Sequence, residues 1–144
     1  MREFVRPAAF DLVISMLTSF GYFEDREDDR TVLRNMFVSL KPGGACVIDV
    51  KGKEGAARTL QPASAEVRPD GTIVVERCRV DNDGTRVRNE VIAIRPSREN
   101  RLFNFDVTVY SGRELREELE AAGFRDVWLY GDLDGRAYGS TPSG

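Results

Sequence analysis

The hydrophobic pattern of the first third of the chain predicts a strand, a helix and a second strand. Residues 10–17 (FDLVISML) form a nearly continuous apolar run, which is typical of a strand buried on both faces of a parallel sheet. Acidic residues at 24–29 lead into apolar positions at helical spacing and predict a helix over 25–40. The Lys-Pro-Gly-Gly turn at 41–44 ends this helix, and residues 45–50 form a second buried strand. This order predicts a right-handed βαβ unit.

The periodicity then changes. Residues 51–63 are polar and predict a connection without regular structure. Residues 72–80 alternate between apolar and polar positions, and an Asp-Asn-Asp-Gly turn leads from them into strand-like sequence over 85–94, which predicts a β-hairpin. Residues 101–110 add a third strand with one apolar face. The pattern therefore predicts an antiparallel β-meander within residues 64–110.

The last third of the chain contains a helix with complete start and stop signals. Ser111 is a good N-cap, Glu114 follows three residues later and completes a capping box, and Gly123 suits the left-handed position after the last turn. Residues 124–130 predict a further strand. At this length, one domain over residues 1–144 is expected.

The composition narrows the possible chemistry. The chain has no histidine, which excludes histidine-dependent catalytic triads and zinc sites with His ligands. Its two cysteines, Cys46 and Cys78, are too few for a disulfide framework. A solvated helix start explains the acidic residues at 24–29, so no metal is expected. The chemistry must therefore rest on carboxylates, tyrosines, backbone amides or a reactive cofactor.

Charge and hydropathy bear on the expected partners. With a net charge of −3 and dispersed arginines, the chain offers no basic stripe, so nucleic acid is not an expected ligand. No apolar run reaches the length of a membrane span and the amino terminus lacks the apolar core of a signal peptide, so we expect no membrane partner and a cytoplasmic location. A small molecule is the expected ligand.

The order of several short motifs resembles the class I S-adenosylmethionine-dependent methyltransferases, and within them the small-molecule members with a β insertion after the fifth strand. The resemblance spans nearly the whole chain. It is carried by the first buried strand with Leu-Thr-Ser-Phe-Gly-Tyr-Phe (17–23), Leu-Lys-Pro-Gly-Gly (40–44), a strand ending in Asp49, Tyr-Ser-Gly-Arg-Glu-Leu (110–115), Ala-Gly-Phe (122–124) and Tyr-Gly-Asp-Leu-Asp-Gly (130–135).

The resemblance implies an α/β fold: the fourth to sixth strands of a Rossmann-like sheet, with the meander as an insertion that covers the acceptor site. The family's Gly-rich loop and the acidic residue that binds the ribose have no counterpart here, and both are expected upstream of Met1. Relatives usually finish with a basic-apolar strand after the loop corresponding to residues 131–144. The resemblance thus predicts the carboxy-terminal portion of a methyltransferase.

The resemblance also implies cofactor contacts. Ser15, Met16 and Leu17 end the first strand, where open α/β sheets bind their ligands, and the family places them beside the methionine part of S-adenosylmethionine. The alternative is that they are core residues at a strand end. Met1 and Arg2 continue a motif that contacts the adenine, or else they form a frayed terminus.

Three further residues are candidates for the small-molecule methyl acceptor. Ser19 and Tyr22 lie in a loop that could close over the sulfonium and the acceptor, with the aromatic face stabilising the cation; hydrophobic docking of the next helix is the alternative for this loop. Asp49 could orient an acceptor amine or hydroxyl, or it could cap a loop. No catalytic residue is assigned.

Two functions follow, with a third weaker one. The first is methyl transfer from S-adenosylmethionine to N or O of a small molecule by in-line displacement. The alternative is a non-catalytic, truncated methyltransferase-like fragment that self-associates, because an unpaired sheet edge and uncovered apolar surface would favour a homodimer. The third treats the meander as a small ligand-binding module.

Overall fold

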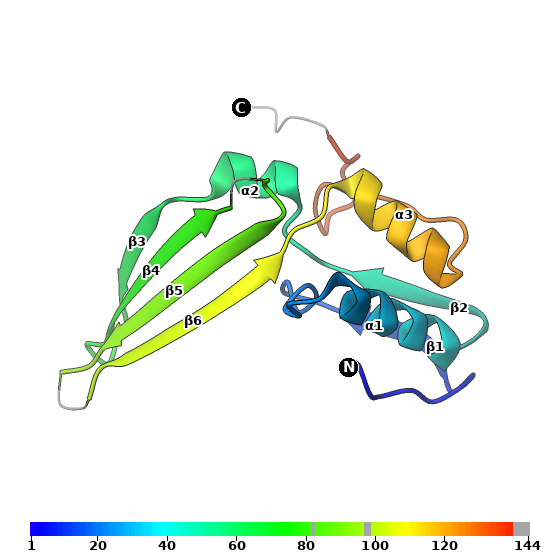
Figure 1. The fold of residues 1–144 in the computed structure, drawn as a ribbon, viewed down its shortest axis with the longest axis horizontal. Helices are drawn as coiled ribbons and strands as arrows, with labels where there is room; N and C mark the ends of the chain where they lie inside the picture. Colours follow the sequence, from blue (N-terminus) through cyan, green and yellow to red (C-terminus); the bar gives the residue numbers. More distant parts are fainter. Residues whose placement is uncertain (82, 97–98, 140–144) are drawn as a thin grey trace.

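The computed structural model describes residues 1–81, 83–96 and 99–139, and it begins with the predicted βαβ unit (Figure 1). Strand β1 (Phe10–Ser15), helix α1 (Arg26–Ser39) and strand β2 (Leu40–Ile48) follow one another. β1 and β2 pair in parallel, from Leu12 opposite Ala45 to Ser15 opposite Ile48. The predicted α/β class is thus confirmed.

Helix α1 covers one face of this two-stranded sheet. The core consists of apolar residues of α1, of the loop after β1 and of the region around α3: Phe20, Val32, Leu33, Met36, Tyr110 and Leu115, with Val13, Cys46 and Ile48 of the strands packed against them. The other face of the sheet carries Leu12, Ile14 and Val47, which are exposed. The sequence pattern predicted strands buried on both faces, but only the face that packs against α1 is buried.

The turn at the start of β2 differs from the prediction. The helix ends at Ser39, and the Lys-Pro-Gly-Gly segment belongs to β2 instead of forming a separate turn. Leu40 already pairs with Phe10, and a register shift follows before Leu12 pairs with Ala45. Gly43 has a φ of 80°. The segment is therefore an irregular strand start, with glycine at the position that needs a left-handed backbone.

The second sheet is an antiparallel meander in the order β3-β4-β5-β6. Its strands are β3 (Ala63–Val67), β4 (Ile73–Val80), β5 (Arg86–Ile94) and β6 (Arg101–Thr108). The three predicted strands are confirmed. β3 was not predicted, because every side chain of this short strand is exposed and it carries little apolar signal. Helix α2 (Lys53–Thr59) likewise replaces part of the connection predicted to lack regular structure.

Helix α3 (Gly112–Ala122) has the predicted ends. The Ser111 side chain accepts from the Glu114 backbone N–H, the Glu114 side chain accepts from the Ser111 N–H, and Gly123 has a φ of 112°. α3 lies beside α1, and an ion pair of 2.8 Å joins Arg30 to Glu118. β6 leads from the meander directly into α3 (Figure 1).

The predicted strand over 124–130 is wrong. Asp126 has a φ of 54°, which interrupts an extended backbone, and Phe124 packs edge-on against Phe37 of α1. The one bridge assigned to the described part of this segment joins Tyr130 to Ala137. A strand needs a neighbour that accepts its backbone hydrogen bonds, and this segment lies against a helix instead.

Among the described residues, no helix is long and apolar enough to span a bilayer.

Candidate functional site

The carboxyl ends of β1 and β2 lie side by side, and Asp49 joins them. The Asp49 N–H donates to the Ser15 carbonyl at 2.8 Å, and the Thr18 N–H donates to the Asp49 carbonyl at 3.1 Å. The Asp49 carboxylate (Oδ2) accepts the Leu17 N–H at 2.9 Å. The structure thus brings Ser15, Leu17 and Asp49 together. Of the two interpretations of Asp49, the loop cap is the one that these bonds form.

The backbone just after β1 is strained. Leu17 and Thr18 have φ values of 56° and 54°, in the left-handed region that residues other than glycine rarely adopt. The Leu17 side chain is 86% exposed, so apolar burial does not account for this conformation. Such outliers concentrate at binding sites. The Ser19 hydroxyl and N–H both donate to the Met16 carbonyl, which completes a compact turn held by Asp49.

Ser15 carries an unpartnered hydroxyl at this point. The side chain is 4% exposed, and its Oγ has no hydrogen-bond partner in the described part of the chain. Buried hydroxyls are normally paired, so an orphan at the carboxyl end of a parallel strand fits a polar ligand or a water. Met16 is partly exposed and Leu17 is exposed beside it, and the contact of Ser15, Met16 and Leu17 with the methionine part of S-adenosylmethionine stays a prediction.

The second half of the loop between β1 and α1, residues 16–25, is attached to the meander. The Gly21 carbonyl accepts the Thr108 N–H at 2.7 Å. Gly21 has a φ of 98°, and a Cβ there would lie 2.5 Å from the Thr108 carbonyl oxygen. Tyr22 is 48% exposed and stacks on Phe105 of β6, with ring centroids 5.7 Å apart. The Tyr22 ring therefore lies on the meander side, whereas Asp49 holds the other half of the loop.

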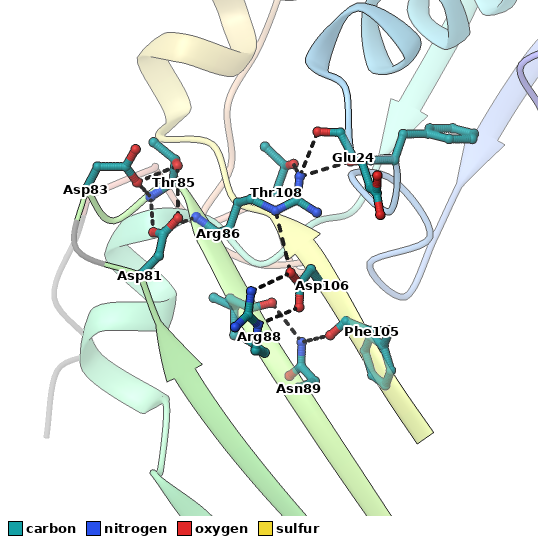
Figure 2. Close-up of polar contacts among 12 residues, drawn as sticks. Glu24, Asp81, Asp83, Thr85, Arg86, Arg88, Asn89, Phe105, Asp106 and Thr108 are labelled. Atoms are coloured by element: carbon teal, nitrogen blue, oxygen red, sulfur yellow. Dashed lines mark hydrogen bonds and ion pairs between the residues drawn. The ribbon is translucent and has the colours of Figure 1, made fainter. Parts of the chain in front are cut away.

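Arg86 of β5 makes a second polar link between the meander and this loop (Figure 2). Its Nη1 donates to the carbonyl oxygens of Phe23 and Glu24 at 3.2 and 2.9 Å. It also lies 3.5 Å from the Thr108 hydroxyl. This role of Arg86 was not predicted from the sequence, because its hydrogen-bond acceptors are backbone carbonyls, which any residue type provides.

A buried carboxylate corrects the interpretation of the acidic cluster. Glu27 is exposed, but Asp29 is 1% exposed and accepts the Tyr110 hydroxyl hydrogen at 2.7 Å. Desolvation raises the pKa of Asp29 above its usual value, against the lowering effect of the Tyr110 hydrogen bond. Burial likewise raises the pKa of Tyr110. The interpretation of the acidic cluster as a solvated helix start is therefore wrong for Asp29. Asp29 lies four and seven residues before Leu33 and Met36, a spacing that puts it on the buried face of α1.

The amino-terminal residues Met1 and Arg2 are the predicted adenine contacts, and Arg2 lies against α1. The Arg2 guanidinium donates to Asp28 at 2.8 Å and lies over the Phe23 ring at 5.6 Å. Asn35 Nδ2 donates to the Arg2 carbonyl at 2.7 Å. Arg2 is therefore held along α1, and its contact with the adenine stays a prediction, as does that of the exposed Met1.

The chain is similar in sequence to a known sugar methyltransferase. It is 27% identical over 140 residues to a dTDP-3-amino-3,4,6-trideoxy-alpha-D-glucopyranose N,N-dimethyltransferase of Streptomyces venezuelae, covering 94% of this chain and 59% of that protein. No protein-family model matches the chain.

Solved methyltransferase structures are also similar to the chain. The CcbJ methyltransferase of Streptomyces caelestis has a TM-score of 0.74 at 17% identity, over 90% of this chain and 56% of that one, which shows the fold. DesVI of Streptomyces venezuelae is 28% identical with a TM-score of 0.66, over 94% and 59%. CalS10, an amino pentose methyltransferase of Micromonospora echinaspora solved with S-adenosylmethionine bound, is 24% identical with a TM-score of 0.65, over 94% and 58%.

The βαβ unit and these likenesses define a Rossmann-like methyltransferase fold. The chain is similar to S-adenosylmethionine-dependent methyltransferases, in agreement with the resemblance that the sequence motifs indicated. It spans 59% of the length of the curated relative that it matches. The comparisons do not favour the non-catalytic alternative.

Proposed function

We propose that this chain takes part in transferring a methyl group from S-adenosylmethionine to an amine nitrogen of a small-molecule acceptor, of the amino-sugar class. The observation that carries the proposal is the turn at residues 15–19, which Asp49 holds in a strained left-handed conformation at the carboxyl ends of two parallel strands. The Streptomyces venezuelae relative, named as an N,N-dimethyltransferase of a 3-amino sugar, supports nitrogen as the acceptor atom.

The cofactor carries the activated methyl group on its sulfonium, and the protein contributes alignment and desolvation. In this proposal the Ser15 hydroxyl and the backbone at Met16 and Leu17 bind the methionine part of the cofactor. Asp49 acts through the loop: by accepting the Leu17 N–H it fixes the direction of the strand end. The chain thus orients one reactant with groups that need no proton transfer, which fits the absence of histidine.

Ser19 and Tyr22 form the acceptor side of the proposed site. One face of the Tyr22 ring is covered by Phe105, and the rest of this half-exposed ring is available to an acceptor or to the sulfonium. An aromatic face near a cation stabilises it by roughly 0.5–2 kcal/mol. An amine acceptor that arrives unprotonated needs no general base in the attack, and it loses its proton to solvent afterwards.

We also propose a cytoplasmic location and a homodimer that pairs through the free edge of β1. Among the described residues β1 pairs with β2 alone, and the exposed side chains of Leu12, Ile14 and Val47 lie on one face of that sheet. Open strand edges with apolar neighbours favour association. Sizing chromatography tests this state: the proposal expects a dimer, and a monomer across the concentration range contradicts it.

A methyl-transfer assay tests the proposed activity. The chain is incubated with S-adenosylmethionine labelled in its methyl group and a dTDP-linked 3-amino sugar, and the matched control acceptor carries a hydroxyl in place of the amine. We expect label on the amino sugar alone. Label on the hydroxyl sugar alone contradicts the choice of nitrogen, and label on neither contradicts activity in this chain.

A further inference from the structure

The loop at residues 16–25 is held at its two ends by different parts of the molecule. Its first half is fixed by Asp49, which accepts the Leu17 N–H at 2.9 Å. Its second half is fixed by the meander, through the Thr108 N–H bond to the Gly21 carbonyl and through Arg86. The proposed cofactor end and the proposed acceptor end of the loop are therefore anchored independently.

Arg86 is well placed for the second anchor. It projects from the first position of β5 toward the loop, and its side chain is three-quarters buried. Nη1 donates to the carbonyl oxygens of Phe23 and Glu24, while Nε lies 3.9 Å from an Asp106 carboxylate oxygen of β6. One guanidinium thus joins β5, β6 and the residues that directly follow Tyr22 (Figure 2).

Its neighbour Arg88 provides a natural comparison. Arg88 lies two residues along β5 on the same face, and its Nε and Nη2 donate to Asp106 at 3.3 and 3.4 Å. Its side chain is 76% exposed, and within the described part of the chain no hydrogen bond or ion pair joins it to residues 16–25. The two arginines therefore share a strand, a face and a carboxylate, and differ in whether they reach the loop.

We infer that Arg86 is a positioning residue: it holds Tyr22 over the proposed site by fixing the backbone that follows Tyr22, and so makes the meander a determinant of acceptor geometry. This inference rests on the proposed function. A guanidinium suits the role because its rigid fork directs Nη1 to the loop carbonyls and Nε toward Asp106, whereas a lysine carries all its donors on one nitrogen.

The Thr108 amide reports directly on the attachment, since its hydrogen bond to Gly21 exists while the loop is docked. Amide exchange followed by NMR is compared for the unsubstituted chain, Arg86→Gln and Arg88→Gln. We expect exchange of Thr108 to rise about tenfold or more in Arg86→Gln, because hydrogen bonds from a charged donor are lost, and to change less than about twofold in Arg88→Gln. The Leu17 amide, held by Asp49, should change in neither variant.

Kinetics separate positioning from a general loss of structure. In Arg86→Gln we expect kcat, or the acceptor KM, to worsen by about tenfold, while the affinity for S-adenosylhomocysteine stays within about twofold, because Asp49 still holds the cofactor end. Arg86→Lys keeps the positive charge, and its kcat and acceptor KM should lie between those of the unsubstituted chain and those of Arg86→Gln. Where Arg86→Gln does not fold, Arg86→Lys against Arg88→Lys gives the same comparison.

The outcomes are distinct. Equal Thr108 exchange in Arg86→Gln and Arg88→Gln overturns the inference, and so does a loss of cofactor affinity that matches the loss of acceptor turnover. If the unsubstituted chain neither binds S-adenosylhomocysteine nor transfers methyl while Thr108 still responds only to Arg86→Gln, the proposed function fails and the attachment of the loop by Arg86 stands.

Discussion

Tyr110→Phe removes one hydroxyl from the most deeply buried polar contact of the core. The Tyr110 ring packs against Phe20 at 5.8 Å between ring centroids and lies under the Arg26 guanidinium at 4.9 Å, and phenylalanine keeps both contacts. What is lost is the donor to the Asp29 carboxylate, 2.7 Å away. The other Asp29 oxygen already lacks a partner in the described part of the chain, so the substitution leaves the buried carboxyl with neither oxygen bonded.

The expected cost follows from this arrangement. A hydrogen bond to a charged group contributes about 1.5–3 kcal/mol, and Asp29, at 1% exposed, receives little solvent screening. For a chain of this size, a loss of that order lowers Tm by about 4–10 °C. Urea and thermal unfolding measure it. Tyr22→Phe is the matched control, because Tyr22 is half exposed, and it should change stability by less than about 0.5 kcal/mol.

The effect should depend on pH. Because burial raises the pKa of Asp29, the native state holds more protons than the unfolded state above the usual value of 3.8, and stability falls as pH rises through the window up to the native pKa. The Tyr110 hydrogen bond opposes that rise, so its loss deepens the deficit at neutral pH. We expect Tyr110→Phe to cost more at pH 7 than near pH 3.5. A cost below about 0.5 kcal/mol, or one equal at both pH values, would refute the reasoning.

Two further predictions concern the loop and α3. Leu17→Gly removes about 1–2 kcal/mol of strain from the left-handed backbone, and the added flexibility of the unfolded chain costs about 0.5–1 kcal/mol. The free energy of unfolding in urea should therefore rise by about 0.5–1 kcal/mol. A lower free energy of unfolding would contradict this and would mean that the Leu17 side chain packs against the protein. Desolvation raises the pKa of Glu114, but Lys53 at 2.8 Å and the Ser111 N–H outweigh it and hold that pKa at about 2, below the usual 4.5. The stability that Glu114 contributes is present above pH 4.5 and is lost as pH falls through about 2. Glu114→Gln should therefore be less stable than the unsubstituted chain by about 1 kcal/mol at pH 7, and the two should have equal stability near pH 2. A stability difference that stays constant with pH would contradict this.

Local signals made part of the fold predictable. Long apolar runs identified β1 and β2, and the capping box of α3 depends on residues three positions apart, so both could be read from the sequence. The strand expected over 124–130 failed for the opposite reason, because a strand depends on a partner that local pattern does not specify. β3 was missed since its pairing with β4 uses backbone groups and small exposed side chains.

The candidate site divides in the same way. Ser15 and Asp49 were predictable, because the carboxyl ends of adjacent parallel strands meet wherever the chain forms a βαβ unit. Arg86 was not, since it lies more than sixty residues from the carbonyls that it binds. Asp29 was predictable in principle from its helical spacing to Leu33, but the surrounding run of acidic residues indicated a solvated surface.

An NMR titration with S-adenosylhomocysteine tests the central claim most directly, namely that the carboxyl ends of β1 and β2 hold the methionine part of the cofactor. We predict saturable shifts of the amides of Met16, Leu17 and Thr18, with the amides of the turn between β3 and β4, residues 68–72, unaffected. Asp49→Ala, which removes the acceptor of the Leu17 N–H, should weaken these shifts. Shifts centred elsewhere, or none at millimolar ligand, would contradict the account.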